Sequence, residues 1–326
     1  MNDVDAAIFL LRAGQVVGLP TETVYGLAAD ATQAEAVKKI FEIKKRPQGH
    51  PLIVHLAELG WLSSYCSGPL DRAQKLGTAF WPGPLTLILP RREGTVPDVV
   101  TGGLLTVGVR VPRHARALEV IAGLGRPVAA PSANRFGGVS PTTRAHVLRD
   151  LGDDVPLVVE GGFCEVGLES TILDLSRKDA YLLRPGAITR QDLEAVLQEP
   201  VYEDDGHGPA APGTLDSHYA PRAQVILVSA EHLWSLAREM ATSKRVGVLA
   251  LPGNETPRDV TCEVFEVTGD LNAAAHELYA ALRQLDEAGC EVILSTRPDL
   301  QGIGIAIVDR LNRAAAPRDP STSSTI

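Results

Sequence analysis

Cysteine, methionine and aromatic residues are scarce in this chain of 326 residues, which has four cysteines, two methionines and 5% aromatic residues. The cysteines Cys66, Cys164, Cys262 and Cys290 are widely scattered, so no CxxC pair exists. This spacing excludes a zinc ribbon and a thioredoxin-like redox motif. Reduced thiols in a cytoplasmic protein are the simplest interpretation.

An excess of positive charge and a long apolar run are also absent. The formal net charge is −9, which argues against a protein that binds nucleic acid mainly through an overall positive charge. No apolar run is long enough to cross a membrane. The first residues, MNDVDAAIFLLRAG, carry acids and no cleavage-type signal, so we expect no membrane association.

The overall composition, 44% hydrophobic and 22% charged, is ordinary for a globular protein, and the length suggests two domains. A Pro-, Gly- and acid-rich segment, QEPVYEDDGHGPAAP, starts at Gln198 and is typical of a linker. We therefore expect a first domain over 1–197, a linker over 198–223, a second domain over 224–316 and a disordered tail over 317–326.

In the second half, strand-like segments alternate with helix-like segments. The expected strands are 225–228, 245–251, 263–267 and 291–296, and the expected helices are 230–241, 271–288 and 305–316. Such alternation predicts a small parallel α/β domain of Rossmann-like type.

The stretch Pro127–Thr142, PVAAPSANRFGGVSPT, predicts a buried strand that leads through a hydroxyl- and glycine-rich loop into a helix. Backbone N–H groups and a helix N-terminus in such a loop can bind phosphate. The alternative is a connection whose Ser and Thr only cap the helix. Since neither a Walker loop nor GxGxxG is present, this stretch alone favours the cap.

Cationic and imidazole side chains follow in two places. Lys44 and Arg46 end a predicted helix, where cations are typical of a solvated cap. His50 and His55 flank a short strand, but their spacing is not that of a metal motif. In the alternating strand LTVGVRV, Thr106 and Arg110 share one face, and that pairing favours an anion-binding Arg110.

Taken together, the motifs resemble the YrdC-type threonylcarbamoyl-AMP synthases in their longer, two-domain form. The resemblance covers nearly the whole chain in order. Its motifs are PTETVYGLAADA (20–31), KKRPQGHPLIVH (44–55), FWPGPLTLIL (80–89), TVGVRVP (106–112), APSANRFGGVSPT (130–142), LESTILDL (168–175), LLRPG (182–186), APGTLDSHYAP (211–221) and GIAIVDRLNRAA (304–315).

The resemblance implies a YrdC-like, twisted mixed sheet with flanking helices in the first domain, and it implies roles for particular residues. The catalytic cluster would be Lys44, Arg46, Ser132 and Asn134. The ATP contacts would be Arg46, His50, Thr106, Ser132, Ser140, Arg184 and Tyr219. The L-threonine contacts would be Thr23, His55, Arg110, Ala130 and Ser170.

The implied reaction joins bicarbonate or CO2 to L-threonine and then transfers AMP from ATP, with release of pyrophosphate. A magnesium ion is expected on the phosphates, with few protein carboxylates to hold it. The product would pass to a downstream tRNA threonylcarbamoyl-transferase complex that modifies the adenosine next to the anticodon, and any direct tRNA binding would be weak or indirect.

Two other classes remain as alternatives. One is a carbamoyltransferase of the hydrogenase-maturation type, which would bring an acylphosphatase module and zinc-finger cysteines that this chain lacks. The other is a non-catalytic RNA-binding or ribosome-maturation module, against which the net charge weighs. For Tyr219 the alternatives are a linker that folds back over the nucleotide as a lid and an ordinary packing aromatic of the second domain.

Overall fold

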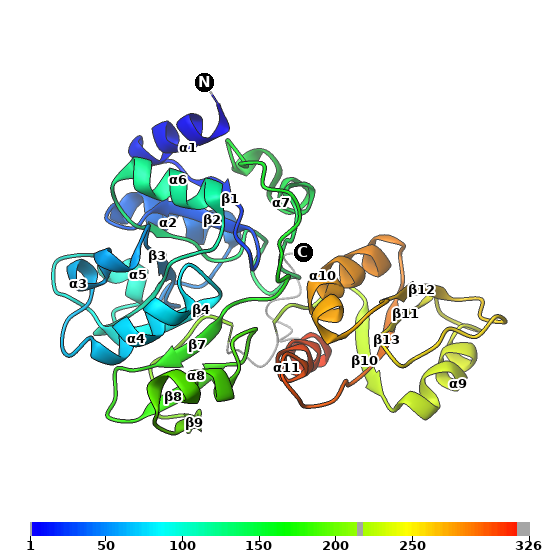
Figure 1. Cartoon of the computed structure of the whole chain (residues 1–326). Helices are drawn as coiled ribbons and strands as arrows, with labels where there is room; N and C mark the ends of the chain where they lie inside the picture. The colour runs from blue at the N-terminus through cyan, green and yellow to red at the C-terminus, as the bar shows by residue number, and fades with distance from the viewer. Residues whose placement is uncertain (1, 214–217, 318–326) are drawn as a thin grey trace. The chain divides into compact units, whose positions relative to one another are not determined.

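The computed structural model describes residues 2–213 and 218–317 (Figure 1). The chain divides into two compact units. The first comprises Met1–Phe136, Pro141–Glu165 and Glu169–Thr214. The second comprises Gly137–Ser140, Val166–Leu168 and Leu215–Ile326. Two short segments that are flanked on both sides by the first unit therefore group with the second unit.

In the described part of the first unit, the strands form one mixed sheet in the order β1-β2-β6-β3-β5-β4-β7-β8-β9. The pairs β3·β5, β4·β7 and β8·β9 are parallel and the other neighbours are antiparallel. The strands are β1 (Val17–Leu19), β2 (Gly26–Asp30), β3 (Ile53–His55), β4 (Leu85–Pro90), β5 (Thr106–Arg110), β6 (Val128–Ala129), β7 (Thr171–Asp174), β8 (Ala180–Arg184) and β9 (Val201–Glu203).

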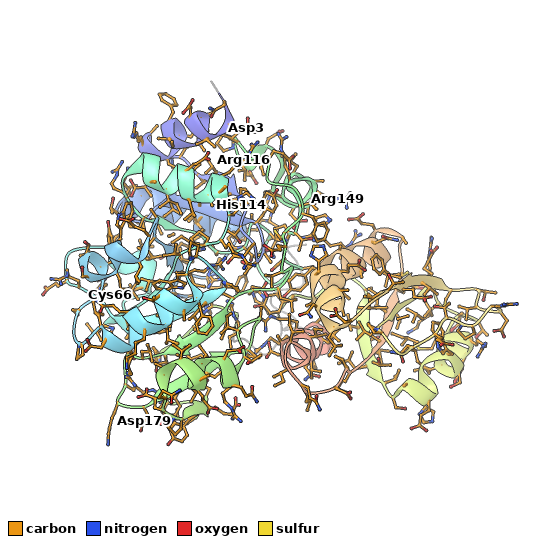
Figure 2. The ribbon with its side chains drawn as sticks, in the orientation of Figure 1. Asp3, Cys66, His114, Arg116, Arg149 and Asp179 are labelled. Carbon is orange, nitrogen blue, oxygen red and sulfur yellow. The ribbon has the colours of Figure 1, made fainter. Side chains whose placement is uncertain are left out.

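Helices flank this sheet, and Figure 2 shows Asp3 on α1 and Asp179 in the β7–β8 turn at opposite ends of the unit. The α-helices are α1 (Asp3–Arg12), α2 (Ala34–Lys44), α3 (Leu62–Tyr65), α4 (Asp71–Phe80), α5 (Asp98–Thr101), α6 (Ala115–Leu124), α7 (Arg144–Leu151) and α8 (Arg190–Leu197). Two 3-10 turns, η1 (Leu59–Trp61) and η2 (Gly152–Asp154), connect them.

The alternation of side chains along the strands separates two apolar layers. On β2, Leu27 and Ala29 belong to the larger core with α2, α4 and α8, whereas Ala28 belongs to a smaller core with α1 and α6. Successive side chains of a strand point to opposite faces, so the sheet has helices on both sides at this end. Figure 1 shows α1 and α6 side by side on one of these faces.

The second unit has a parallel sheet in the order β10-β13-β11-β12, as its alternating pattern predicts. The strands are β10 (Gln224–Val228), β11 (Val246–Ala250), β12 (Glu263–Glu266) and β13 (Val292–Thr296), and the helices are α9 (Ala230–Met240), α10 (Leu271–Glu287) and α11 (Gly304–Ala315). Across the described residues of the chain, no helix combines the length and the apolar content that a membrane span requires.

The segment expected to be a linker contains structure that its composition does not predict. Val201–Glu203 is the edge strand β9, which pairs in parallel with β8. Backbone hydrogen bonds to an existing strand order this segment although its own side chains are mostly exposed. Part of the remaining linker (214–217) and most of the expected tail (318–326) lie outside the described residues.

Leucine-to-alanine substitutions test the position of the first core. Leu87 in β4 is fully buried, so Leu87→Ala should lower the free energy of unfolding by about 2–5 kcal/mol through lost transfer energy and a residual cavity. Leu105, which is 82% exposed, provides the matched control, and Leu105→Ala should stay within about 0.5 kcal/mol. Urea unfolding measures both, and equal losses would contradict the assigned core.

Candidate functional site

One face of the first sheet carries polar side chains over β3, β5 and β4, beyond the region that α1 and α6 cover. Val107 and Val109 of β5 point into the larger core, so Thr106, Gly108 and Arg110 lie on the opposite face. Added to Gly108, a Cβ would lie 3.0 Å from a methyl group of Ile88, so the face is closely packed there. The predicted ligand residues gather on this face and at the ends of its strands.

Arg110, the last residue of β5, is held by two acceptors. Its Nη2 donates to Glu22 Oε2 at 2.6 Å, and its Nη1 donates to Thr23 Oγ1 at 2.9 Å. The side chains of Arg110 and Glu22 are 4% and 0% exposed. The sequence pattern favoured an anion-binding Arg110, and the structure buries it in an ion pair with the carboxylate of Glu22.

The hydroxyl groups before β2 orient this contact. Thr21 Oγ1 donates to the carbonyl of Val24 at 2.7 Å, so its proton is used. The 2.9 Å contact between the Thr21 and Thr23 hydroxyls must therefore be donated by Thr23. Thr23 Oγ1 is then left as an acceptor, as Arg110 requires.

Contacts with the segment around Gly161 also hold the loop that carries Thr23. The hydroxyl of Tyr25 donates to the carbonyl of Gly162 at 2.9 Å and accepts from the backbone N–H of Gly161 at 3.0 Å. His114, labelled in Figure 2, precedes α6, and its Nε2 lies 3.3 Å from the carbonyl of Gly161. The segment around Gly161 therefore fixes the loop in place.

His55, the last residue of β3, pairs in register with Arg110 across the parallel ladder. Burial, together with the charge of Arg110, lowers the pKa of His55 to about 3, so the ring is neutral at pH 7. Its Nδ1 lies 3.3 Å from the carbonyl of Ile53, which can only accept. The proton therefore resides on Nδ1, and Nε2 is available as an acceptor beside Arg110.

Lys44, the last residue of α2, is buried and not a solvated cap, so the cap interpretation of this residue is wrong. Its Nζ donates to the carbonyls of Ser132 at 2.5 Å and Asn134 at 2.6 Å. Burial, and then the charge of Arg46, lower the pKa of Lys44 well below its usual value. The loop after β6 is thus tied to the end of α2.

Arg46 and His50 both lie against the aromatic ring of Phe136, which belongs to the same loop. The guanidinium of Arg46 lies 5.4 Å from the ring centroid of Phe136, and the ring of His50 lies 5.8 Å from it. Arg46 Nη2 also donates to the carbonyl of Pro51 at 3.3 Å. Burial and the charge of Arg46 lower the pKa of His50, which favours its neutral form.

A second group of polar side chains lies where β4 adjoins β7, on the side of β4 away from β5. Arg184 donates from Nε to the carbonyl of Ser170 at 3.0 Å and from Nη2 to the Ser170 hydroxyl at 3.2 Å. The Ser170 hydroxyl lies 2.8 Å from that of Thr86, and Arg184 Nη1 donates to the carbonyl of Pro212 at 2.8 Å. Arg184 is therefore fixed at the carboxyl end of β8.

The structure brings some of the predicted residues together and separates others. Thr23, His55 and Arg110 form one group, and the backbone N–H of Ala130 donates to Ile53 beside it. Ser170 contacts Arg184 and the hydroxyl of Thr86, and the register that pairs Leu87 with Val109 puts Thr86 next to Arg110. Thr106 lies at the opposite end of β5 from Arg110, about 13 Å away at the usual rise of a strand.

Ser140 and Tyr219 group with the second unit. Arg283 of α10 donates to the carbonyls of Val139 and Ser140. The ring of Tyr219 is buried and stacks on that of Tyr279, with 5.7 Å between the ring centroids. This contact agrees with the alternative in which Tyr219 is a packing aromatic of the second domain. A nucleotide contact of Tyr219 stays a prediction.

The predicted site residues did not include three that shape these groups: Glu22, Thr86 and Phe136. Glu22 stands inside the TETVY motif, where an acid between two threonines before a buried strand was a usable signal. The sequence held no signal for Thr86 or Phe136, because a threonine in a strand and an aromatic residue in a loop are both common.

Within the described residues, no group of three or more His, Cys, Asp or Glu side chains could hold a metal ion. The acid that lies in the polar face, Glu22, is already bound to Arg110. A metal cage made by protein side chains therefore does not fit this site.

Two family models match adjoining parts of the chain. The model described as "Telomere recombination" (Sua5, YciO and YrdC) matches residues 10–186. The model "Threonylcarbamoyl-AMP synthase, C-terminal domain" matches residues 188–316.

Known proteins are similar over nearly the full length. The threonylcarbamoyl-AMP synthase of Pyrococcus abyssi is 40% identical over 322 residues, which cover 94% of this chain and 92% of the relative. The synthase of Bacillus subtilis is 41% identical over 323 residues, covering 96% and 92%. The crystal structure of P. abyssi Sua5 complexed with L-threonine matches with a TM-score of 0.90 at 38% identity, covering 96% of this chain and 94% of the other.

The depressed pKa of His55 predicts a pH dependence of stability. The unfolded chain binds a proton at His55 below about pH 6.5, and the folded chain binds it only near pH 3. Lowering the pH through this window therefore destabilises the fold, by about 1.4 kcal/mol per pH unit. Urea unfolding of wild type and His55→Gln should show that wild type loses about 2 kcal/mol more between pH 7 and pH 5. Parallel losses would contradict a buried neutral His55.

Proposed function

Because this chain belongs to the family of two-domain threonylcarbamoyl-AMP synthases, we propose that it makes L-threonylcarbamoyl-AMP and pyrophosphate from L-threonine, bicarbonate or CO2, and ATP. The observation that carries the proposal is the buried group of Arg110, Thr23 and neutral His55 on the polar face of the sheet. A guanidinium, a hydroxyl acceptor and an imidazole acceptor suit the carboxylate and the polar groups of a small hydroxy amino acid.

The threonine site would use these groups in complementary ways. Arg110 would bind the α-carboxylate, and Nε2 of His55 would accept a hydrogen bond from the substrate's hydroxyl or amine. Ala130, directly after β6, and Ser170, directly before β7, complete the proposed set. Because the pocket offers polar partners, an analogue without the hydroxyl would leave at least one of them unpaired.

The chemistry needs no covalent protein intermediate. The threonine nitrogen attacks the carbon of CO2 and loses a proton, which gives a carbamate. A carbamate oxygen then attacks the α-phosphorus of ATP, and the bond to the bridging oxygen breaks with release of pyrophosphate. Such a step depends on positioning and on positive charge around the phosphates.

The nucleotide site would be formed by the cationic and hydroxyl groups near the loop after β6. We assign catalytic roles to Lys44, Arg46, Ser132 and Asn134. Nucleotide contacts are assigned to Arg46, His50, Thr106, Ser132, Ser140, Arg184 and Tyr219. Support comes from the contacts that gather Lys44 with Ser132 and Asn134 and place Arg46 and His50 beside Phe136.

Magnesium would enter with ATP as part of the substrate and keep phosphate and water ligands, since no carboxylate cluster of the described chain fits it. The downstream step would be a transfer of the threonylcarbamoyl group to tRNA by a partner complex, with weak or indirect tRNA binding by this chain. A cytoplasmic location is part of the proposal and accords with four free cysteines.

The two alternative classes receive no support from the relatives. Two relatives that the chain covers to 92% of their length are both named threonylcarbamoyl-AMP synthase. A carbamoyltransferase of the hydrogenase-maturation type and a non-catalytic RNA-binding module therefore remain only as outcomes of the activity test.

Pyrophosphate release should depend on L-threonine, bicarbonate and ATP together. Substituting valine for threonine should lower turnover at least about tenfold, because a site built around a hydroxyl discriminates strongly against its loss. A coupled pyrophosphate assay measures this. Equal turnover with valine would overturn the substrate, and a response to carbamoyl phosphate would favour the carbamoyltransferase.

Neighbouring lysines at the end of α2 provide a matched pair of variants. Lys44→Gln should lower kcat/KM at least about tenfold, or about 1.4 kcal/mol of transition-state stabilisation, because the buried cation is lost. Lys45, the exposed neighbour, is the control, and Lys45→Gln should keep both activity and melting temperature. Equal activity of the two variants would remove Lys44 from the catalytic set.

A further inference from the structure

A buried acid lies directly against the proposed carboxylate-binding arginine. Both hydrogen bonds of the Glu22 carboxylate go to one oxygen: Oε2 accepts from Arg110 Nη2 at 2.6 Å and from the backbone N–H of Arg113 at 3.0 Å. The Glu22 side chain is 0% exposed. Glu22 is therefore fixed by the backbone after β5 and cannot move away from Arg110 without losing a buried partner.

Each partner of the ion pair keeps one buried side-chain atom without a hydrogen bond. Glu22 Oε1 and Arg110 Nε are buried and make no hydrogen bond within the described structure. Arg110 Nη1 is held by Thr23 at 2.9 Å, so the guanidinium is fixed from two directions with a donor still available. A buried polar group without a partner is costly, and an incoming acceptor would relieve that cost at the Nε donor of Arg110.

We infer that Glu22 is a positioning residue that holds Arg110 in place and, by neutralising it, sets a moderate affinity for the amino-acid carboxylate. This inference rests on the proposed function, because it takes the substrate carboxylate to bind Arg110. A carboxylate that binds beside Arg110 meets the negative charge of Glu22. Without that charge, Arg110 would be a buried uncompensated cation, and the substrate would be its only counter-charge.

A moderate affinity suits the proposed reaction. The carbamate forms on the threonine nitrogen, so the α-carboxylate is not consumed and remains in the product. The contact with Arg110 must therefore break each time the product leaves. Tight binding of the same group in substrate and product would lower KM without raising kcat.

Glu22→Gln removes the charge with little change of shape. Since both hydrogen bonds go to Oε2, the single carbonyl oxygen of glutamine can accept both, and the amide nitrogen takes the place of Oε1. In the full-length protein, calorimetric titration should show L-threonine binding at least about fivefold tighter to Glu22→Gln than to wild type. ATP affinity should stay within about twofold, while the melting temperature without ligand falls.

Two controls separate charge from structure. L-Threoninamide, which keeps the amine and lacks the carboxylate, should not bind more tightly to Glu22→Gln. Glu22→Asp keeps the charge but shortens the side chain, so it should bind threonine no more tightly than wild type. If Glu22→Gln is too unstable for calorimetry, the threonine-induced rise in melting temperature should still exceed that of wild type.

Failure of the inference differs from failure of the proposed function. If Arg110→Gln weakens threonine binding at least about tenfold but Glu22→Gln binds threonine as wild type or more weakly, the inference is overturned and the function stands. Equal tightening by Glu22→Asp, or of threoninamide, also overturns it. If wild type does not bind threonine, or Arg110→Gln binds it unchanged, the assignment of the carboxylate site falls and the inference with it.

Discussion

The ammonium group of Lys44 lies between the backbone carbonyls of Ser132 and Asn134, and the arrangement of the first unit's catalytic loop depends on this contact. A buried cation without acceptors would be very costly, so the loop after β6 and the end of α2 must stay together. The backbone N–H of Phe136 strengthens the tie by donating to the carbonyl of Lys44 at 2.9 Å. The same contact that stabilises the loop therefore places the proposed catalytic groups.

A second buried cation, Arg110, organises the other end of the polar face. Its neighbours come from two segments: Glu22 and Thr23 from the loop before β2, and His55 from the adjacent strand β3. The positive charge of Arg110 also helps to keep His55 neutral. Burial and this guanidinium together keep the imidazole neutral, and the same guanidinium pairs with the acid, so a carboxylate and a hydroxyl can be recognised side by side.

Local pattern was sufficient for most of the fold. The four strands and three helices of the second unit lie within a few residues of their expected ranges, because alternation and turn residues act over short distances. The edge strand at 201–203 was not predictable, since only its partner β8 makes that acid-rich segment a strand. Strand order, which no local pattern encodes, places β4 between β7 and β5 and so puts Thr86 between Ser170 and Arg110.

The sequence by itself determined which residue types stand at the ends of which elements, and therefore which side chains could bind a carboxylate or a phosphate. Tertiary structure alone decided their state. Lys44 was expected at a solvated helix end and is buried, and Arg110 meets an acid 88 residues away in the chain. The charge and exposure of an ionisable group depend on the atoms that surround it in space, and those atoms come from segments that sequence spacing does not connect.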